Sequence, residues 1–242
     1  MKQAMIFAAG LGTRLKPLTD TMPKALVPVG GQPLLWHVVQ KLKAAGFERI
    51  VVNVHHFAQQ IIDYLQANAN FGLDIRVSDE TELLLETGGG IKKALPLFDP
   101  ESPVLIHNVD ILSNLDLNRL YDHAAQATTL VVSWRETQRY LQFDEQLRLV
   151  GWKNNATGQV KGREARPLAF SGIHVFHPLL FPLLSEWPDR FPIMDFYLKT
   201  CSDHLVRGYV PDHLLLMDVG KTDTLGAADE FLASIAISKQ TT

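Results

Sequence analysis

The sequence has few features of a secreted, membrane or zinc-binding protein. Cys201 is the one cysteine among 242 residues, so no disulfide can form within the chain, and no Cys/His spacing predicts zinc. No apolar run approaches the about 18–20 residues that cross a bilayer. The N-terminal apolar run at 4–9 leads into a glycine turn and lacks the pattern of a secretory signal. We therefore expect a soluble, cytoplasmic protein with no membrane partner.

The chain also lacks an excess of positive charge. It has 23 basic and 26 acidic residues, which gives a net charge of -3. This balance gives no bulk attraction to polyanions, so we expect no nucleic-acid partner, although a local basic pocket remains possible. The hydrophobic fraction of 46% excludes disorder and suffices for a large core. With no internal repeat and no long linker, the chain is expected to form one domain over residues 1–242.

The first half of the chain alternates apolar strands with amphipathic helices. We predict strands at 3–8, 49–54, 74–77, 103–108 and 128–134, and helices beginning at Pro33, over 58–66, from Gly90 and over 116–125. Near-continuous apolar strands that alternate with helices indicate a sheet covered on both faces. The fold class predicted is α/β, with a Rossmann-like, mostly parallel mixed sheet flanked by helices.

The pattern changes after Trp134. We predict strands at 147–152, 168–176 and 205–210, and helices at 178–184, near 195–200 and at 222–237. The regular alternation of the first half is lost here, and a polar segment over 154–166 separates the first two of these strands. We therefore expect the second half to supply a smaller lobe that completes a cleft.

A glycine-rich segment follows the first predicted strand. Gly10 and Gly12 let the backbone approach a ligand and turn its N–H groups toward phosphate, although such a pair also suits a plain structural turn. Arg14 and Lys24 add two cations, which suits a triphosphate. Leu15 occupies the third glycine position of the dinucleotide-binding fingerprint, and no GxxxxGK[ST] motif is present. This spacing argues against a nicotinamide-dependent dehydrogenase and against a P-loop protein.

The run GxGTRLxPLT at 10–19, followed by PKALVPV at 23–29, resembles the signature of the sugar-1-phosphate nucleotidyltransferases, also called nucleoside-diphosphate-sugar pyrophosphorylases. The resemblance continues in the family's order at 86–91, 108–110, 170–173 and 218–221, and so covers nearly the whole chain. It implies an enzyme that transfers a nucleoside monophosphate from a nucleoside triphosphate to a sugar-1-phosphate. The products would be a nucleotide sugar and pyrophosphate, and the cofactor would be Mg²⁺.

The resemblance also implies roles for particular residues. Asp110 and Asp218 match the metal-binding aspartates of the family, although an aspartate at a strand end can also cap the next helix. Arg14 and Lys24 match residues that contact the phosphates, and are the catalytic candidates. The expected nucleotide-binding residues, with Gly88 and Gly89 beside the nucleobase, are Ala8, Ala9, Gly10, Gly12, Thr13, Arg14, Lys24, Gly88, Gly89 and Asn108.

The sugar-phosphate side departs from the family pattern. Many relatives carry Glu-Lys-Pro where this chain reads Gly-Trp-Lys-Asn at 151–154, so Lys153 is the candidate for the incoming phosphate, with Lys161 and Arg163 as alternatives. Met217 stands where an aromatic residue is common before the second metal aspartate. The expected sugar-phosphate-binding residues are Glu86, Lys153, Gly172 and Asp195, although Glu86 and Asp195 also suit helix caps.

Within this family the motifs and the short chain resemble the N-acetylmuramate-1-phosphate uridylyltransferases, which implies UTP as the donor. Mannose-1-phosphate guanylyltransferase and glucose-1-phosphate thymidylyl- or uridylyltransferase are the alternatives. A non-catalytic regulatory homologue that binds a nucleotide sugar is a further alternative, which the presence of both aspartates and both cations disfavours. We expect a nucleotide-binding half over about 1–134 and a sugar-binding half, with the second metal ligand, over about 135–242. No sizeable accessory domain is expected, and the protein would be a monomer or a homodimer.

Overall fold

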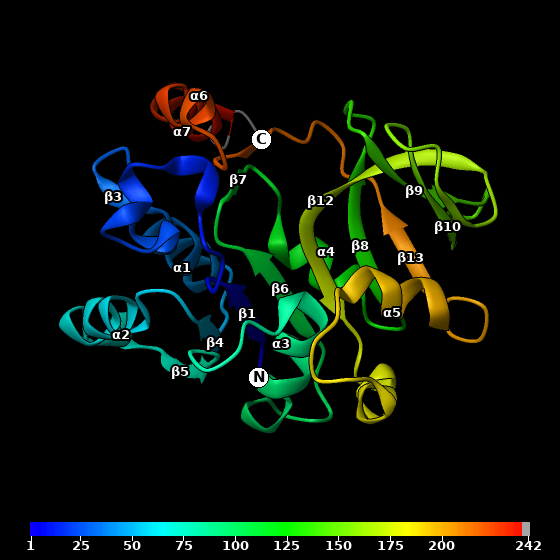
Figure 1. Ribbon diagram of the computed structural model, residues 1–242, viewed down its shortest axis with the longest axis horizontal. Helices are drawn as coiled ribbons and strands as arrows, with labels where there is room; N and C mark the ends of the chain where they lie inside the picture. Colours follow the sequence, from blue (N-terminus) through cyan, green and yellow to red (C-terminus); the bar gives the residue numbers. More distant parts are fainter. Residues whose placement is uncertain (239–242) are drawn as a thin grey trace.

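The structure, a computed structural model that describes residues 1–238, is organised around a mixed sheet (Figure 1). Along one edge-to-edge path the strand order is β11-β10-β9-β12-β6-β1-β4-β5, and β8 joins β12 to β13. The strands are β1 (Gln3–Phe7), β4 (Arg49–Val54), β5 (Asp74–Asp79), β6 (Val104–Asn108), β8 (Thr128–Ser133), β9 (Arg139–Phe143), β10 (Leu149–Asn154), β11 (Val160–Gly162), β12 (Arg166–Phe176) and β13 (Val206–Tyr209). Two small two-stranded sheets are β2 (Pro28–Val29) with β3 (Gln32–Pro33), and β7 (Ile111–Ser113) with β14 (Leu216–Asp218).

Strands β6, β1, β4 and β5 are parallel, as their apolar runs predicted. The chain proceeds from β1 outward to β4 and β5, and then returns to β6 on the other side of β1. This change of direction leaves a crevice beyond the carboxyl ends of β1 and β6, where open α/β sheets bind their ligands. The register supports this geometry, because Phe7 of β1 pairs with Asn108 of β6 at the ends of both strands.

The second half of the chain extends the sheet with antiparallel strands. β12 pairs antiparallel with β6, β8 and β9, and β10 pairs antiparallel with β9 and β11. The α/β class with a mixed central sheet is thus confirmed. Strands β9 and β11 were not predicted, because both are short and lie between polar loop segments.

Helices cover both faces of the sheet. Ala4 and Ile6 of β1 face a core shared with α1, α2, α4 and α7, whereas Met5 faces a second core shared with α3 and α5. The helices are α1 (Leu34–Ala44), α2 (Ala58–Ala67), α3 (Glu86–Ala94), α4 (Leu117–His123), α5 (Ile193–Thr200), α6 (Thr222–Gly226) and α7 (Ala228–Ser238). No helix within residues 1–238 is long and apolar enough to span a membrane.

Three predicted helices differ in detail from the structure. The helix expected from Gly90 begins at Glu86, because glycines 88–90 lie inside α3 and pack closely against other segments. The closing helix expected over 222–237 is divided into α6 and α7. The helix expected at 178–184 forms two 3₁₀ turns, Pro178–Leu180 and Pro182–Glu186, each with a proline in its first turn.

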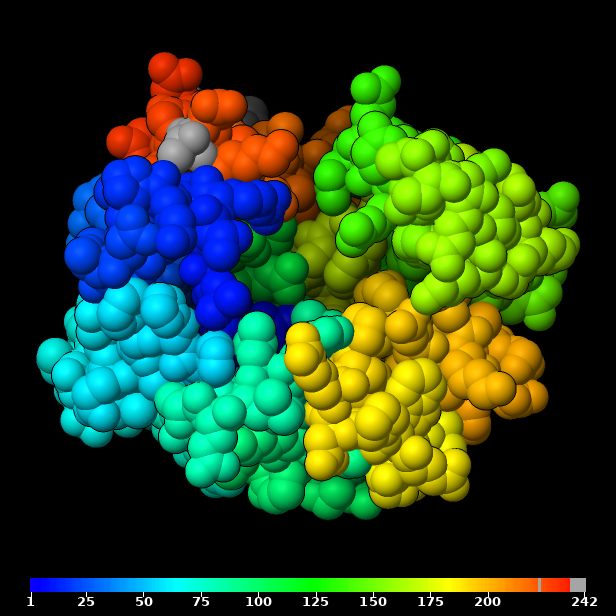
Figure 2. Space-filling view, viewed as in Figure 1, coloured from blue at the N-terminus to red at the C-terminus, as the bar shows by residue number. Residues whose placement is uncertain are grey.

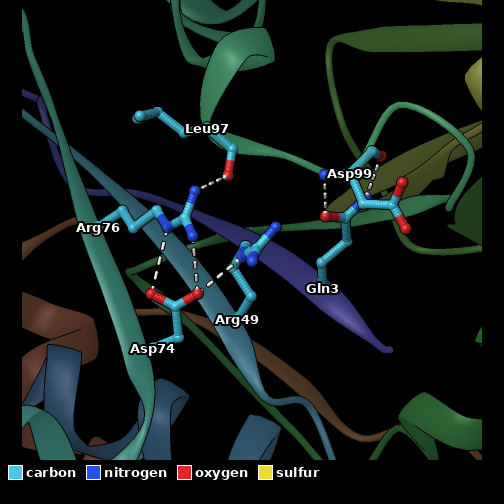
Figure 3. Close-up of polar contacts among 6 residues, drawn as sticks. All are labelled: Gln3, Arg49, Asp74, Arg76, Leu97 and Asp99. Carbon is cyan, nitrogen blue, oxygen red and sulfur yellow. Dashed lines mark hydrogen bonds and ion pairs between the residues drawn. The ribbon is translucent and has the colours of Figure 1, made fainter.

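Polar side chains form hydrogen bonds at the amino ends of the parallel strands (Figure 3). Gln3 at the start of β1 accepts from the N–H of Asp99 at 2.8 Å and donates to its carbonyl at 2.8 Å. Arg49 and Arg76 both donate to Asp74, and these hydrogen bonds, Arg76 first, lower the pKa of the Asp74 carboxyl. These contacts tie neighbouring strands together at the end of the sheet opposite to the crevice.

Candidate active site

A cavity of about 570 Å³ lies at the carboxyl ends of β1 and β6. Figure 2 shows the same face hollowed between the N-terminal segment, in blue, and the second half of the chain, in green and yellow. The lining residues are Phe7, Ala8, Ala9, Gly10, Leu11, Gly12, Thr13, Arg14, Lys24, Asn53, Glu80, Leu84, Glu86, Thr87, Asn108, Val109, Asp110, Pro192 and Gly220. Most of the residues expected to bind the nucleotide therefore surround one cavity.

The glycine-rich loop forms one wall of this cavity and depends on Gly12. The φ angle of Gly12 is 64°, in the left-handed region that favours glycine. A Cβ at this position would also lie 2.8 Å from Cγ2 of Thr19, which is closer than side chains tolerate. The Thr19 hydroxyl donates to the Gly12 carbonyl at 2.9 Å, and the Leu15 N–H donates to the same carbonyl at 2.8 Å. These contacts fold the loop back on itself and hold its backbone against the cavity.

Two carboxylates meet beside the loop although they are far apart in the sequence. Asp110 follows β6, and Asp218 ends β14, which pairs with β7 so that Asp218 lies opposite Ile111. The N–H of Val219 donates to the carbonyl of Asp110 at 2.8 Å and ties the two segments together. Desolvation in the cleft raises the pKa of the Asp218 carboxyl, and the negative charge of Asp110 raises it further. Both carboxylates thus contribute charge to the same small volume.

Two cations accompany this pair. The ammonium of Lys24, a residue that is only 8% exposed, forms an ion pair with Asp110. A Cβ at Gly220 would lie 2.5 Å from Oδ1 of Asp218 and 2.7 Å from Nη2 of Arg14, so glycine leaves room for both side chains. The structure therefore brings together Arg14, Lys24, Asp110 and Asp218, the four charged residues singled out in the sequence.

The two glycines expected beside the nucleobase have a different environment. The N–H groups of Gly88 and Gly89 donate to the carbonyl of Phe191 at 2.8 and 3.2 Å, and neither glycine lines the cavity. A Cβ at Gly88 would lie 2.2 Å from the Phe191 ring. Glu86 does line the cavity, and its carboxylate accepts from Nε of Arg190 at 3.2 Å. In the structure these two N–H groups are therefore engaged within the protein.

Asn108 lines the cavity, and Gly172, which does not line it, lies beside Asn108. Gly172 of β12 has a φ angle of 73°, and a Cβ there would lie 2.9 Å from Nδ2 of Asn108. Close to them, Arg135 donates to the carbonyl of Phe170 at 2.8 Å, and its positive charge offsets a small part of the rise in the pKa of Asp218. Arg135 was not predicted, because its segment carries no motif.

The remaining sugar-side candidates lie away from this cavity. Lys153 forms an ion pair with Glu164 at 2.6 Å, and Asp195 forms one with Lys161 at 2.7 Å. Arg163, the other alternative, lines a separate groove of about 470 Å³ formed by the loop after β9 and the segment that leads into β12. The structure does not bring Lys153 and Asp195 to the charged cluster at Asp110.

Two buried polar residues in the cavity wall were missed in the sequence. Asn53 is 3% exposed and Glu80 is fully buried, and the two side chains are hydrogen-bonded at 2.8 Å. Asn53 interrupts the apolar strand Arg-Ile-Val-Val-Asn-Val, and a polar residue in a buried strand is the signal that could have identified it.

The loop, the cations and the carboxylate pair, placed at the ligand-binding edge of an α/β sheet, define an enzyme that acts on phosphorylated substrates. Comparison with known families agrees with this class. Residues 3–234 match the family model described as nucleotidyl transferase, so the chain belongs to the nucleotidyl transferase family and is a nucleotidyltransferase, as the motifs implied.

Individual relatives cover almost the entire chain. N-acetylmuramate alpha-1-phosphate uridylyltransferase of Caulobacter vibrioides is 36% identical over 247 residues, which cover 96% of this chain and 97% of that protein. The enzyme of the same name from Neisseria meningitidis is 36% identical and covers 74% of this chain and 77% of its own length. The crystal structure of HddC from Yersinia pseudotuberculosis complexed with GMP-PN has a TM-score of 0.76 at 24% identity, and covers 96% of this chain and 100% of its own. This last likeness supports the fold.

Proposed function

We propose that this protein transfers a uridylyl group from UTP to N-acetylmuramate-1-phosphate and releases pyrophosphate. The observation that carries the chemistry is the meeting of Asp110 and Asp218 with Arg14 and Lys24 at one cavity. The choice of substrates is supported by two relatives of that activity at 36% identity, one of which is matched over 97% of its length.

The reaction needs no general base, because the attacking oxygen of the sugar phosphate is already an anion. That oxygen forms a bond to the α-phosphorus of UTP, the bond from the α-phosphorus to the bridging oxygen breaks, and pyrophosphate leaves with the electron pair. The protein must hold two repelling anions in line and neutralise the charge that develops on the oxygens. Arg14 and the glycine-rich backbone suit the triphosphate, and Lys24 suits the α-phosphate once substrate competes with Asp110 for its ammonium.

The residues present also fit a divalent cation. Desolvation and, second to it, the charge of Asp110 raise the pKa of Asp218, so the two carboxylates repel each other, and a divalent cation held by both would offset this repulsion. Among residues 1–238 no cluster of three or more His, Cys, Asp or Glu side chains could hold a metal, so phosphate oxygens would complete the ligand set. A bound Mg²⁺ would neutralise charge on those oxygens.

The further assignments are proposed on the same basis. Residues of about 1–134 would bind the nucleotide, and residues of about 135–242 would bind the sugar and supply the second metal ligand. On the nucleotide side, Gly10, Gly12, Thr13 and Asn108 are supported by their place in the cavity wall. On the sugar side, Glu86 has the same support, whereas Lys153 and Asp195 would have to exchange their present ion pairs for substrate.

A substrate panel tests this proposal. The protein would be incubated with Mg²⁺, each of five common nucleoside triphosphates and a set of sugar-1-phosphates, and pyrophosphate release would be followed. We expect the highest kcat/KM with UTP and N-acetylmuramate-1-phosphate. A higher value for GTP with mannose-1-phosphate, or for glucose-1-phosphate with UTP or dTTP, would replace the proposed substrates. No release with any pair would refute the activity.

A further inference from the structure

Two buried polar side chains, Asn53 in β4 and Glu80 just after β5, connect the end of β1 to the start of helix α3. Oδ1 of Asn53 accepts from the N–H of Ala8 at 2.8 Å and from the N–H of Ala9 at 3.3 Å. Nδ2 of Asn53 donates to Oε1 of Glu80 at 2.8 Å, and Oε2 of Glu80 accepts from the N–H of Leu85 at 3.1 Å. These hydrogen bonds run from the start of the glycine-rich loop to the residue before α3, and every donor among them has an acceptor.

The chemistry of the two side chains fixes their orientation. Asn53 must direct its carbonyl at the two backbone N–H groups, and its amide nitrogen then points to Glu80. A carboxylate is an acceptor at both oxygens, so it can receive Asn53 on one side and Leu85 on the other. Glu80 thereby prevents the Asn53 amide from rotating, since rotation would turn an NH₂ group toward the N–H groups of Ala8 and Ala9.

The molecule makes room for this pair at a cost. Burial raises the pKa of the Glu80 carboxyl, which reflects the energy needed to keep a charge away from water. A Cβ at Gly90 would lie 2.8 Å from Oε1 of Glu80 and 3.3 Å from Nδ2 of Asn53, so the third glycine of the Glu-Thr-Gly-Gly-Gly motif leaves space for both. A buried acid that only filled space would be replaced by an apolar residue at a gain in stability.

We propose that Asn53 and Glu80 are positioning residues for nucleotide binding. Asn53 fixes the first turn of the glycine-rich loop by accepting hydrogen bonds from the N–H groups of Ala8 and Ala9, and Glu80 fixes the orientation of the Asn53 amide. The proposal rests on the proposed function, because it takes this loop to be the nucleotide site. Neither side chain takes part in bond making. Their effect is exerted on the backbone that lines the cavity, so it falls on the affinity for the triphosphate.

The test exchanges the amide of Asn53 and the carboxylate of Glu80 between the two positions. In Glu80→Gln only one oxygen remains for two donors, and in Asn53→Asp two carboxylates face each other. In the double variant Asn53→Asp/Glu80→Gln all donors are matched again: the new carboxylate accepts from Ala8, Ala9 and the new amide, whose oxygen accepts from Leu85. Since a lost hydrogen bond to a charged group costs about a tenfold change in equilibrium, each single variant should raise the KM for UTP about tenfold, and the double variant should restore it to within about threefold.

A matched control lies at the other end of the same strand. Gln3→Glu also replaces a fully buried amide by a carboxylate, and turns an oxygen toward the carbonyl of Asp99 (Figure 3). The same oxygen would face the carbonyl of Ser102. It should lower the melting temperature but leave the KM for UTP unchanged, because β1 is perturbed away from the loop. The KM for N-acetylmuramate-1-phosphate should change little in all four variants.

Hydrogen exchange provides a readout that needs no turnover. Amide exchange of the segment 7–11 should be about tenfold faster in each single variant than in the wild type, and slow again in the double variant. Three results would each overturn the positioning role. The single variants could have the wild-type KM for UTP and wild-type amide exchange, or the double variant could have a KM for UTP as high as that of the single variants. Gln3→Glu could also raise the KM for UTP as much as the single variants do. If the wild type releases no pyrophosphate but the exchange pattern is as expected, the positioning role stands for the loop and the proposed substrates are refuted.

Discussion

His174 gives the most quantitative prediction that the structure allows. The residue lies near the carboxyl end of β12, is 1% exposed and packs against the rings of Phe170 and Tyr197, at centroid distances of 5.6 and 5.7 Å. Its two ring nitrogens have no hydrogen-bond partner among residues 1–238. Burial lowers the pKa of His174 from 6.5 to about 3. The native state therefore keeps this imidazole neutral at every pH at which the enzyme is handled.

The sign and size of the effect on stability follow from this shift. Below pH 6.5 the unfolded chain binds a proton at His174 that the native state does not bind. The free energy of unfolding therefore has its full value above that pH and decreases as the pH falls toward 3. Linkage between these two pKa values gives a loss of about 2 kcal/mol between about pH 7 and about pH 5. His107, whose pKa burial also lowers to about 3, adds a similar amount.

The assay compares His174→Phe with the wild type by urea unfolding at both pH values. The variant cannot be protonated at this position. Its free energy of unfolding should therefore fall by about 2 kcal/mol less than that of the wild type between the two pH values. His174→Leu should behave alike if phenylalanine proves too large, and the exposed His56→Phe should retain the wild-type dependence. An equal loss in His174→Phe and the wild type would refute the argument that the native imidazole is held neutral by burial.

Three further predictions concern the site. Asp110→Asn and Asp218→Asn should each reduce turnover at least about a hundredfold, because each removes one charge from the carboxylate pair; near-normal pyrophosphate release in both would contradict the metal assignment. Asp218→Asn should change the melting temperature little, whereas Asp110→Asn should lower it, because it leaves the Lys24 ammonium without its carboxylate. Removal of divalent cations with EDTA should abolish pyrophosphate release, added Mg²⁺ should restore it, and turnover that persists in EDTA would count against a metal. Gly12→Ala should cost about 1–2 kcal/mol in unfolding free energy, since the left-handed φ of 64° disfavours a side chain. It should also lower kcat/KM about a hundredfold, since the contact with Thr19 displaces the loop, and wild-type kinetics would show that the loop tolerates a Cβ.

Much of the site could be predicted because its parts lie at strand ends. Arg14 and Lys24 follow a glycine-rich turn, and Asp110 follows a strand that begins with the apolar residues 104–106. These positions depend on local backbone preferences, which a short segment carries by itself. The helix start at Glu86 was missed for the opposite reason. Three consecutive glycines have poor intrinsic helix propensity, and packing against Phe191 overrides it.

The sequence by itself determined most of the strands and helices and their order, the glycine-rich loop, the charged residues and the family. It did so because apolar periodicity and turn residues act over a few positions along the chain. Tertiary structure alone decided which side chains meet. Asp218 reaches Asp110 through the pairing of β14 with β7, and Asn53 reaches Glu80 because β4 and β5 are neighbours with α3 packed close by. Lys153 and Asp195 found acidic and basic partners of their own, since ion pairing is settled by distance in space, which no local pattern encodes.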